Sequence, residues 1–131
     1  MPTLHDTDIV KRFVAAFDAA DRPGLVDCLA EDLVADVTQA DGSTRQIVGR
    51  DPYMAAIDAM HIDTVRPSVR TTQSTQISPG RVLIMVEIRA TRKGRSLHNF
   101  ATFLMVVRDA RICRIWMVEA RPAESDAFWK D

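Results

Sequence analysis

The change of hydrophobic period at about the middle of the chain limits the fold more than any other feature. After Pro67 the residues alternate between apolar and polar and are rich in valine, isoleucine and threonine, whereas the residues before it follow a helical period. The alternating region divides at short turn sequences into four stretches: 69–77, 81–92, 96–108 and 111–121, with turns at Pro79-Gly80, Lys93-Gly94 and Asp109-Ala110. Four successive strands joined by short turns predict an antiparallel meander.

The first half of the chain predicts three helices and a short hairpin. The expected elements are a helix from about residue 7, a second from 22 to about 30, strands at 33–38 and 45–48, and a third helix from 52 to about 60. Apolar residues recur at spacings of three and four in the first helix: Ile9, Val10, Phe13, Val14, Phe17 and Ala20. Asp21 before Pro23, and Asp51 before Pro52, are typical helix starts.

The helices must cover one face of the sheet, because each of these elements needs a partner for its apolar side. The chain has 131 residues, of which 47% are hydrophobic and 27% charged. This composition is typical of one globular domain with a substantial core. The sequence therefore predicts a single α+β domain over residues 1–131, in which three helices of the N-terminal half pack on one face of an antiparallel sheet.

Charge and motifs exclude several classes of partner. With 17 basic and 18 acidic residues the formal net charge is −1, so we expect neither nucleic acid nor a membrane surface as a partner. No apolar run is long enough to span a bilayer, and the polar residues 1–8 do not resemble a secretory signal. Cys28 and Cys113 are expected as two buried thiols in a reducing cytoplasm, with a disulfide between them as the alternative. Scattered histidines and the lack of a glycine-rich loop predict no metal and no cofactor.

Four stretches carry a family resemblance through their order and spacing: residues 10–21, residues 29–37, Gly49-Arg50-Asp51, and residues 107–112 followed by Trp116. In them the chain resembles the nuclear transport factor 2-like superfamily, in its SnoaL-like and ketosteroid isomerase-like branch. The resemblance covers nearly the whole chain and implies a cystatin-like, cone-shaped barrel, with a strongly bent antiparallel sheet and the helices on its concave face. It also implies an apolar pocket between the layers. It is specific to the fold and not to a reaction.

The resemblance places the catalytic carboxylate of the isomerases at Val37 and their two oxyanion donors at Phe13 and Leu104. None of these three side chains can exchange a proton, so we do not expect steroid isomerase chemistry. Asp36 precedes Val37 and is expected to point to the other side of its strand. An alignment shifted by one residue would bring Asp36 into the pocket.

Glu119 is the first candidate for proton transfer. Ile115, Met117 and Glu119 share one face of the last predicted strand, and the resemblance directs this face toward the pocket. A carboxylate beside isoleucine and methionine loses its hydration, which raises its pKa toward the range useful to a general base. The alternative is a hydrated glutamate at the strand end, paired with Arg121 or another cation.

His98 is the second candidate, because histidine exchanges protons near neutral pH. His98, Phe100, Thr102 and Leu104 share one side of their predicted strand, and the resemblance matches this side to the pocket. The alternative is a histidine at the pocket rim that hydrogen-bonds a turn. Asn99, on the other side, is expected to belong to a dimer surface.

Glu87 and Arg89 face the same way along one strand. Together with Glu119 they would form an acid–arginine–acid set similar to that of limonene epoxide hydrolase, with the order of acid and arginine reversed. The alternative is an exposed ion pair on the outer sheet face, which would contribute little to stability. Tyr53, on the third helix, is expected either to direct its hydroxyl into the pocket or to be a core aromatic.

Three functional readings remain open at this point. The first is a metal-independent enzyme of the isomerase, cyclase, dehydratase or hydrolase type that acts on a small hydrophobic compound. The second is a non-catalytic binder of a hydrophobic molecule, and the third is an adaptor domain. The expected apolar lining, besides the groups above, is Phe13, Phe17, Val37, Ile57, Ile115 and Met117. A homodimer is expected through the outer sheet face, where it would cover Phe103, Met105 and Trp116.

Overall fold

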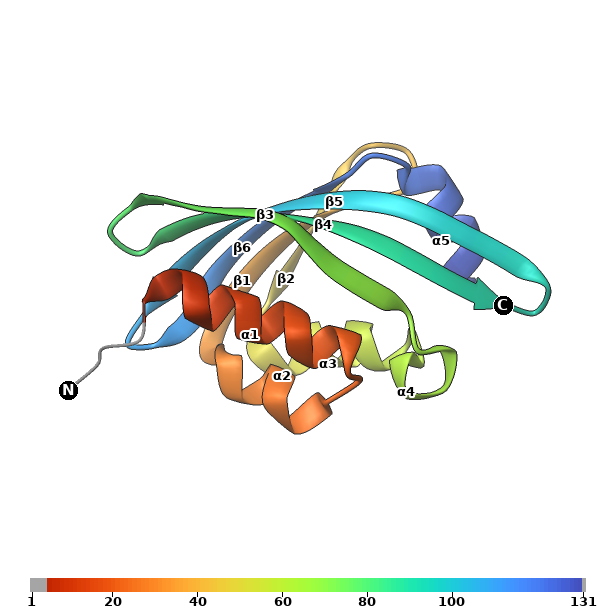
Figure 1. Ribbon diagram of the computed structural model, residues 1–131. Coiled ribbons are helices and arrows are strands. Elements are labelled where there is room, and N and C mark those ends of the chain that lie inside the picture. Colours follow the sequence, from red (N-terminus) through yellow and green to blue (C-terminus); the bar gives the residue numbers. More distant parts are fainter. Residues whose placement is uncertain (1–4, 131) are drawn as a thin grey trace.

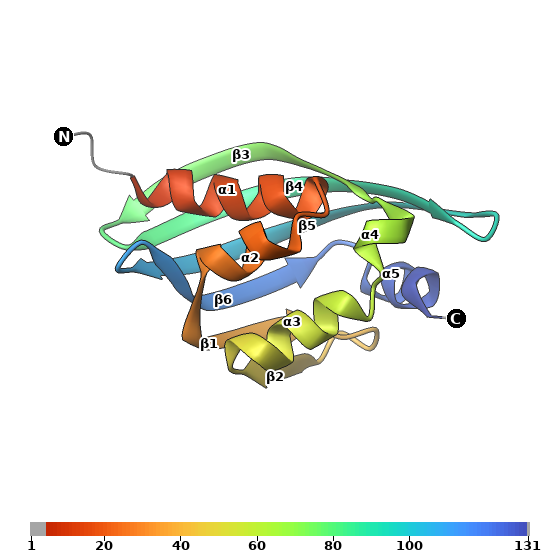
Figure 2. The same cartoon turned by 90° about the horizontal axis from the view of Figure 1, so that it is seen from below.

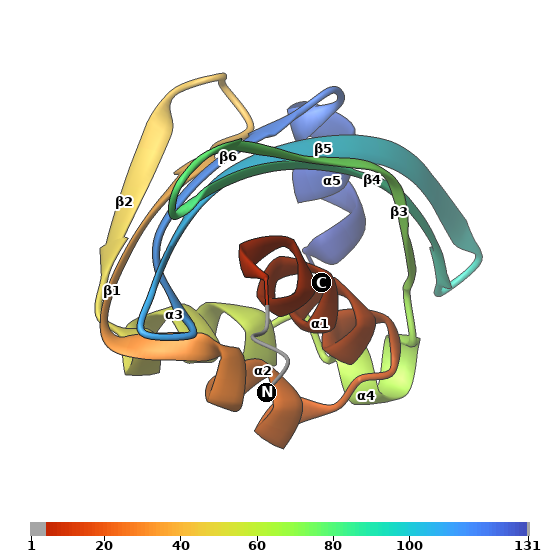
Figure 3. The same cartoon turned by 60° about the vertical axis from the view of Figure 1, so that its left-hand side comes forward.

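The computed structural model describes residues 5–130, and six strands form one strongly bent sheet (Figures 1 and 3). The strands are β1 (Leu29–Thr38), β2 (Thr44–Val48), β3 (Ser68–Ser78), β4 (Arg81–Arg92), β5 (Arg95–Arg108) and β6 (Arg111–Glu119). The meander β3–β6 lies within two residues of its predicted boundaries. Of the polar segment 1–8, residues 1–4 lie outside the described residues, as does residue 131.

The sheet differs from the predicted one in two respects. Its order is β2-β1-β6-β5-β4-β3, and β1 pairs with β6 in parallel, with Ala35 opposite Ile115, so the sheet is mixed and not wholly antiparallel. In the described part of the chain, β2 and β3 are the edge strands and do not pair with each other, so the sheet forms an open arch and does not close into a barrel. The predicted α+β class, with helices on the concave face, is confirmed.

Within residues 5–130, five helices accompany the sheet: α1 (Asp6–Asp18), α2 (Arg22–Cys28), α3 (Arg50–Asp58), α4 (Ile62–Val65) and α5 (Pro122–Trp129). Helices α1, α2 and α3 lie across the concave side, and α5 lies at one end of the arch (Figure 2). Asp21 accepts a hydrogen bond from the Gly24 N–H at 3.1 Å, which begins α2 as expected. Gly49 takes a positive φ of 101° before α3, which favours glycine. No helix in residues 5–130 is long and apolar enough to cross a membrane.

The concave face of the sheet is the core face. On β4 it presents Val82, Ile84 and Val86, and on β5 it presents Ala101 and Met105, all of them buried. This result reverses the predicted faces of β5, since Phe103 and Met105 point inward. His98, Phe100, Thr102 and Leu104 therefore lie on the convex face. Successive side chains of a strand alternate, so an error of one residue moves a whole set to the other side.

Candidate functional site

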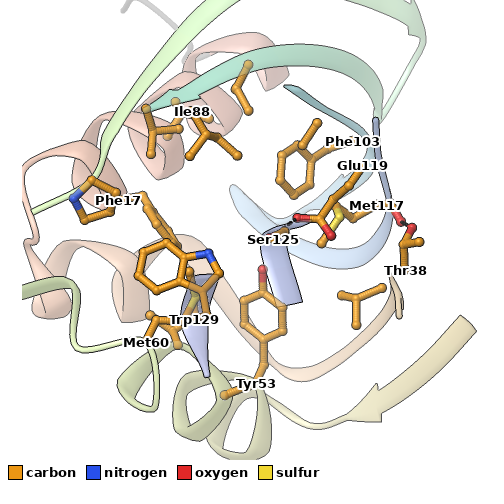
Figure 4. A pocket seen from close by; sticks show the side chains of 18 of the residues that line it. Phe17, Thr38, Tyr53, Met60, Ile88, Phe103, Met117, Glu119, Ser125 and Trp129 are labelled. Atoms are coloured by element: carbon orange, nitrogen blue, oxygen red, sulfur yellow. Dashed lines mark hydrogen bonds between the residues drawn. The ribbon is translucent and has the colours of Figure 1, made fainter. Parts of the chain in front are cut away.

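A cavity of about 230 Å³ lies between the concave face of the sheet and the helices, shown from close by in Figure 4. Its lining comes from α1, α3, α5 and all six strands, and most of the lining residues are apolar. The lining contains seven of the residues predicted for ligand contact or catalysis: Phe13, Phe17, Val37, Tyr53, Ile57, Met117 and Glu119. Because the volume lies below the roughly 300–1,000 Å³ of common ligand pockets, it suits a small molecule.

Two further predictions concern residues on the last strand and the first. Ile115 faces inward as predicted, but it is fully buried in the core and does not line the cavity. Asp36 points away from the cavity, as expected, and accepts a hydrogen bond from Arg114 Nη2 at 2.7 Å. This bond lowers the pKa of Asp36. Asp36 therefore has a structural partner outside the site.

The six remaining predicted site residues lie on the convex face: Glu87, Arg89, His98, Phe100, Thr102 and Leu104. The prediction that the four β5 residues face the pocket is wrong, because the alternation along β5 was assigned to the opposite side. Glu87 and Arg89 on β4 instead form the ion pair on the outer sheet face that was the alternative for them, at 3.4 Å. Glu87 accepts from Arg70 at 2.8 Å and lies 2.8 Å from His98 Nε2. The hydrogen bond with His98 lowers the pKa of Glu87. An acid–arginine–acid set with Glu119 is not assembled, since the sheet separates the groups.

Glu119 lies in the cavity wall at the end of β6 and is half-buried. Its Oε1 accepts hydrogen bonds from Ser125 Oγ at 3.0 Å and from Asn99 Nδ2 at 3.3 Å. Burial raises the pKa of Glu119 above the ordinary value of 4.5. Arg121 is not its partner, because that guanidinium donates to the carbonyl oxygen of His98 at 3.0 Å. The arrangement matches a desolvated carboxylate better than a hydrated strand end.

Tyr53 supplies a second polar group to the cavity. In Figure 4 its hydroxyl points into the space beside Glu119 and Ser125. Within residues 5–130 this hydroxyl has no hydrogen-bond partner, although the residue is buried. Burial also raises the pKa of Tyr53, so the hydroxyl keeps its proton and is able to donate it in a hydrogen bond.

The mouth of the cavity contains residues that sequence reasoning did not single out. A second, open hollow of about 500 Å³ adjoins the cavity and shares seven lining residues with it: Val37, Thr38, Arg45, Met60, Glu119, Ser125 and Trp129. Polar residues dominate its remaining lining, among them Gln39, Asp41 and Lys130. Glu119 therefore lies where an apolar chamber meets a polar mouth.

The raised pKa of Glu119 leads to a prediction about stability. The folded protein binds this proton more tightly than the unfolded chain, so the free energy of unfolding falls as pH rises from about 4.3 through the folded pKa. Glu119→Gln removes this loss and keeps an oxygen that accepts from Asn99 and Ser125. We expect it to stabilise the protein by less than about 1 kcal/mol at pH 8, since the group is partly screened by solvent.

The measurement is thermal unfolding of wild type and Glu119→Gln at pH 8 and at pH 3.5. The two proteins should unfold at the same temperature at the lower pH, where both side chains are neutral. Glu124→Gln is the matched control, because Glu124 is exposed and next to the same site. A Glu119→Gln variant that is less stable than wild type at pH 8 would contradict the desolvated carboxylate.

Comparisons with known proteins agree with this geometry. The family model described as a SnoaL-like domain matches residues 10–115. An uncharacterised protein of Mycobacterium tuberculosis and one of Mycobacterium bovis are each 28% identical over 125 residues, which is 95% of both chains compared. These relatives span the same length as this chain, and their names indicate no activity.

Solved structures of similar shape come from several sources. A protein of unknown function with a cystatin-like fold from Xanthomonas campestris superposes with a TM-score of 0.83 at 18% identity and covers 98% of this chain and 100% of its own. Bal32a, from a soil-derived mobile gene cassette, has a TM-score of 0.82 at 17% identity, with 95% and 96% covered. IdmH, a putative polyketide cyclase from Streptomyces antibioticus, has a TM-score of 0.75 at 17% identity, with 94% and 99% covered.

Proposed function

Because the chain belongs to the SnoaL-like domain family, we propose that its cavity binds a small hydrophobic molecule and that Glu119 exchanges a proton with it. The observation that carries this proposal is a half-buried carboxylate of raised pKa in the wall of a mostly apolar cavity. Groups with such pKa values are enriched at catalytic sites. The similarity in fold to a putative polyketide cyclase supports the same class of substrate.

The arrangement suits proton abstraction next to a carbonyl group. The Glu119 carboxylate takes a proton from a carbon of the bound molecule, and the electron pair of the broken C–H bond moves to the carbonyl oxygen. The Tyr53 hydroxyl donates a hydrogen bond to this oxygen as its negative charge develops. Glu119 then returns the proton to another atom of the molecule, so the reaction needs no oxidant and no co-reactant. The polar mouth near Arg45 holds the more polar end of the molecule.

The second candidate function is binding without catalysis. It is favoured by the lining, in which apolar side chains predominate, and by Phe13, which occupies the place that the family resemblance assigns to an oxyanion donor. The two functions differ in what they require of Glu119. A catalyst needs a carboxylate that is poised to exchange a proton, whereas a binder needs only the apolar volume.

A pH titration of Glu119 by carbon-detected NMR distinguishes them, with Glu119→Gln used to assign the signal. We expect an apparent pKa clearly above that of a free glutamate, because the carboxylate is desolvated. A compound library of small ketones would then be screened against wild type and Glu119→Gln. An ordinary pKa would remove the proposed catalytic group and leave the binding function.

We also propose that the protein forms a homodimer through the convex face of the sheet. An antiparallel sheet usually exposes a polar outer face to water. In this protein Met85, Phe100 and Val118 are exposed on the convex face. On the same face the half-buried Leu83 and Leu104 are direct cross-strand neighbours. An apolar surface of this kind is typical of an interface, and two copies meeting around a two-fold axis cover it on both.

We propose the cytoplasm as the compartment in which the protein works. Cys28 is buried and Cys113 half-buried, and both are free thiols, a state that a reducing compartment maintains. Burial raises the pKa of Cys28, which makes it unreactive. Fractionation of cells that produce the protein tests this proposal.

A further inference from the structure

The two oxygens of the Glu119 carboxylate have different surroundings. Oε1 accepts from Asn99 Nδ2 on β5 at 3.3 Å and from Ser125 Oγ on α5 at 3.0 Å. Oε2 has no hydrogen-bond partner among residues 5–130. Two donors from different elements therefore fix one oxygen, and the other remains available to a molecule in the cavity.

Asn99 is oriented by the backbone and is fully buried. Its Oδ1 accepts from the Arg121 N–H at 3.0 Å, so the amide nitrogen is directed toward Glu119. If the Asn99 amide were turned over, its NH2 group would face the Arg121 N–H, which is also a donor. Its oxygen would then face the Glu119 carboxylate, which is also an acceptor. A fully buried amide that satisfies both of its ends in this way holds its neighbour in one position. Asn99 does not line the cavity, so it acts through Glu119.

Ser125 depends on α5, and α5 is fixed to the β4–β5 hairpin. Arg92 Nη1 donates to the carbonyl oxygen of Trp129 at 2.7 Å, and Arg95 donates to those of Ala127 at 2.9 Å and Lys130 at 3.1 Å. These arginines satisfy carbonyls that the end of a helix leaves without partners. Phe128 is buried in a small cluster with Ala90 and Leu97. The helix therefore presents a buried Ser125 at a defined place.

We propose that Asn99 and Ser125 are positioning residues that hold Oε1 of Glu119, so that Oε2 is the oxygen that exchanges the proton with the bound molecule. The C-terminal helix α5 is then part of the site as well as its cover. This inference rests on the proposed proton exchange at Glu119. Glu119, Ser125 and Trp129 all lie beyond the residues 10–115 that match the family model.

The proton balance follows from the hydrogen bonds. In the neutral form of Glu119 the proton resides on Oε2, because the Asn99 amide at Oε1 can only donate in this orientation. The carboxylate takes the proton from a carbon of the bound molecule at Oε2, and the neutral acid so formed returns it from the same oxygen to another atom of that molecule. Nothing is oxidised or reduced.

Several charged and titratable groups surround Glu119, and their effects differ in sign. On α5, the Ser125 hydroxyl stabilises the carboxylate and lowers its pKa, whereas the negative charge of Asp126 raises it. Asp126 is paired with Lys130 at 2.7 Å. Arg45 on β2 and Tyr53 on α3 line the same cavity. Substitutions of Ser125 and Asp126 should therefore move the titration of Glu119 in opposite directions.

The test is an NMR titration of Glu119 in full-length variants that differ only in the hydroxyl. Ser125→Thr and Ser125→Val are a matched pair, because both add the same branch and only threonine keeps the donor. We expect the pKa of Glu119 to be higher in Ser125→Val than in Ser125→Thr, and Ser125→Thr to resemble wild type. Asp126→Asn should lower this pKa. Ser96→Ala, the loss of an exposed hydroxyl on β5, should leave it unchanged.

The outcomes separate this inference from the proposed function. An ordinary Glu119 pKa in wild type would end the proposed proton exchange. A Glu119 pKa that is raised and is the same in Ser125→Thr, Ser125→Val and Asn99→Leu would overturn the positioning roles of Ser125 and Asn99. The proposed proton exchange at Glu119 would still stand. Should a substrate be found, the valine variant is expected to lose kcat with little change in KM and to show a shifted pH profile, which loss of helix packing would not produce.

Discussion

Substituting Ala56 by tryptophan is expected to weaken binding of a small aromatic ketone such as 2-acetylnaphthalene by at least about 10-fold, equivalent to about 1.4 kcal/mol. Ala56 is half-buried on α3 and lines the cavity. An indole ring placed there takes much of the 230 Å³ that a ligand would occupy. Since this space is open, the ring does not force other core side chains to move, and the fold should remain intact.

Ala55→Trp is the control for this substitution. Ala55 is the neighbouring residue on the same helix but is exposed, so the same ring there points into solvent. Isothermal titration calorimetry of wild type and both variants measures the binding, and circular dichroism checks the fold. Equal affinity in wild type and Ala56→Trp would show that the ligand binds elsewhere, and the proposed function would lose its site.

The meander was predictable because its signals are local. Each strand of β3–β6 alternates over several residues, and each turn carries a glycine or a residue of positive φ, such as Lys93 and Asp109. Alternation together with turn chemistry fixes both the strands and their antiparallel order. The parallel pairing of β1 with β6 joins residues about 80 positions apart, and no local pattern reports it.

The face of β5 could not be read from its own sequence. Large apolar residues occupy both sides of this strand, with Phe103 and Met105 inside and Phe100 and Leu104 outside. When both faces of a strand are apolar, the alternation shows that the segment is a strand. It does not show which of the two sets of side chains faces the core. Because the two faces of β5 were assigned the wrong way round, the prediction placed His98 in the site and Asn99 outside it. Asn99 is nevertheless the residue that donates a hydrogen bond to Glu119.

The prediction placed Glu119 in the site correctly, because it assigned Ile115, Met117 and Glu119 to the inward face of β6. Its partner Ser125 was not foreseen, since no local sequence pattern predicts the helix α5. The helix lacks a strong apolar stripe, and it is defined by its contacts with the β4–β5 hairpin, which are tertiary. Sequence reasoning therefore located the carboxylate and missed the elements that orient it.

The second large effect is expected on the convex face, where Val118→Lys should convert a dimer into a monomer. Val118 is 61% exposed and lies on β6 opposite Thr102, which in turn pairs with Met85. In a two-fold interface each substitution appears twice, so two ammonium groups would be buried without partners. Each such group costs several kcal/mol. We expect the dissociation constant to rise by at least about 100-fold, equivalent to about 2.7 kcal/mol.

Val48→Lys is a closely matched control for the dimer, because Val48 is 64% exposed and lies on the edge strand β2. Analytical ultracentrifugation of wild type and both variants at several concentrations measures the association. We expect wild type and Val48→Lys to sediment as dimers, and Val118→Lys to sediment as a folded monomer whose circular dichroism spectrum matches that of wild type. The unfolding temperature of Val118→Lys should be lower, because dimerisation stabilises the folded wild type. A wild-type protein that remains monomeric at high concentration would contradict the dimer, and dissociation by Val48→Lys would move the interface to the sheet edge.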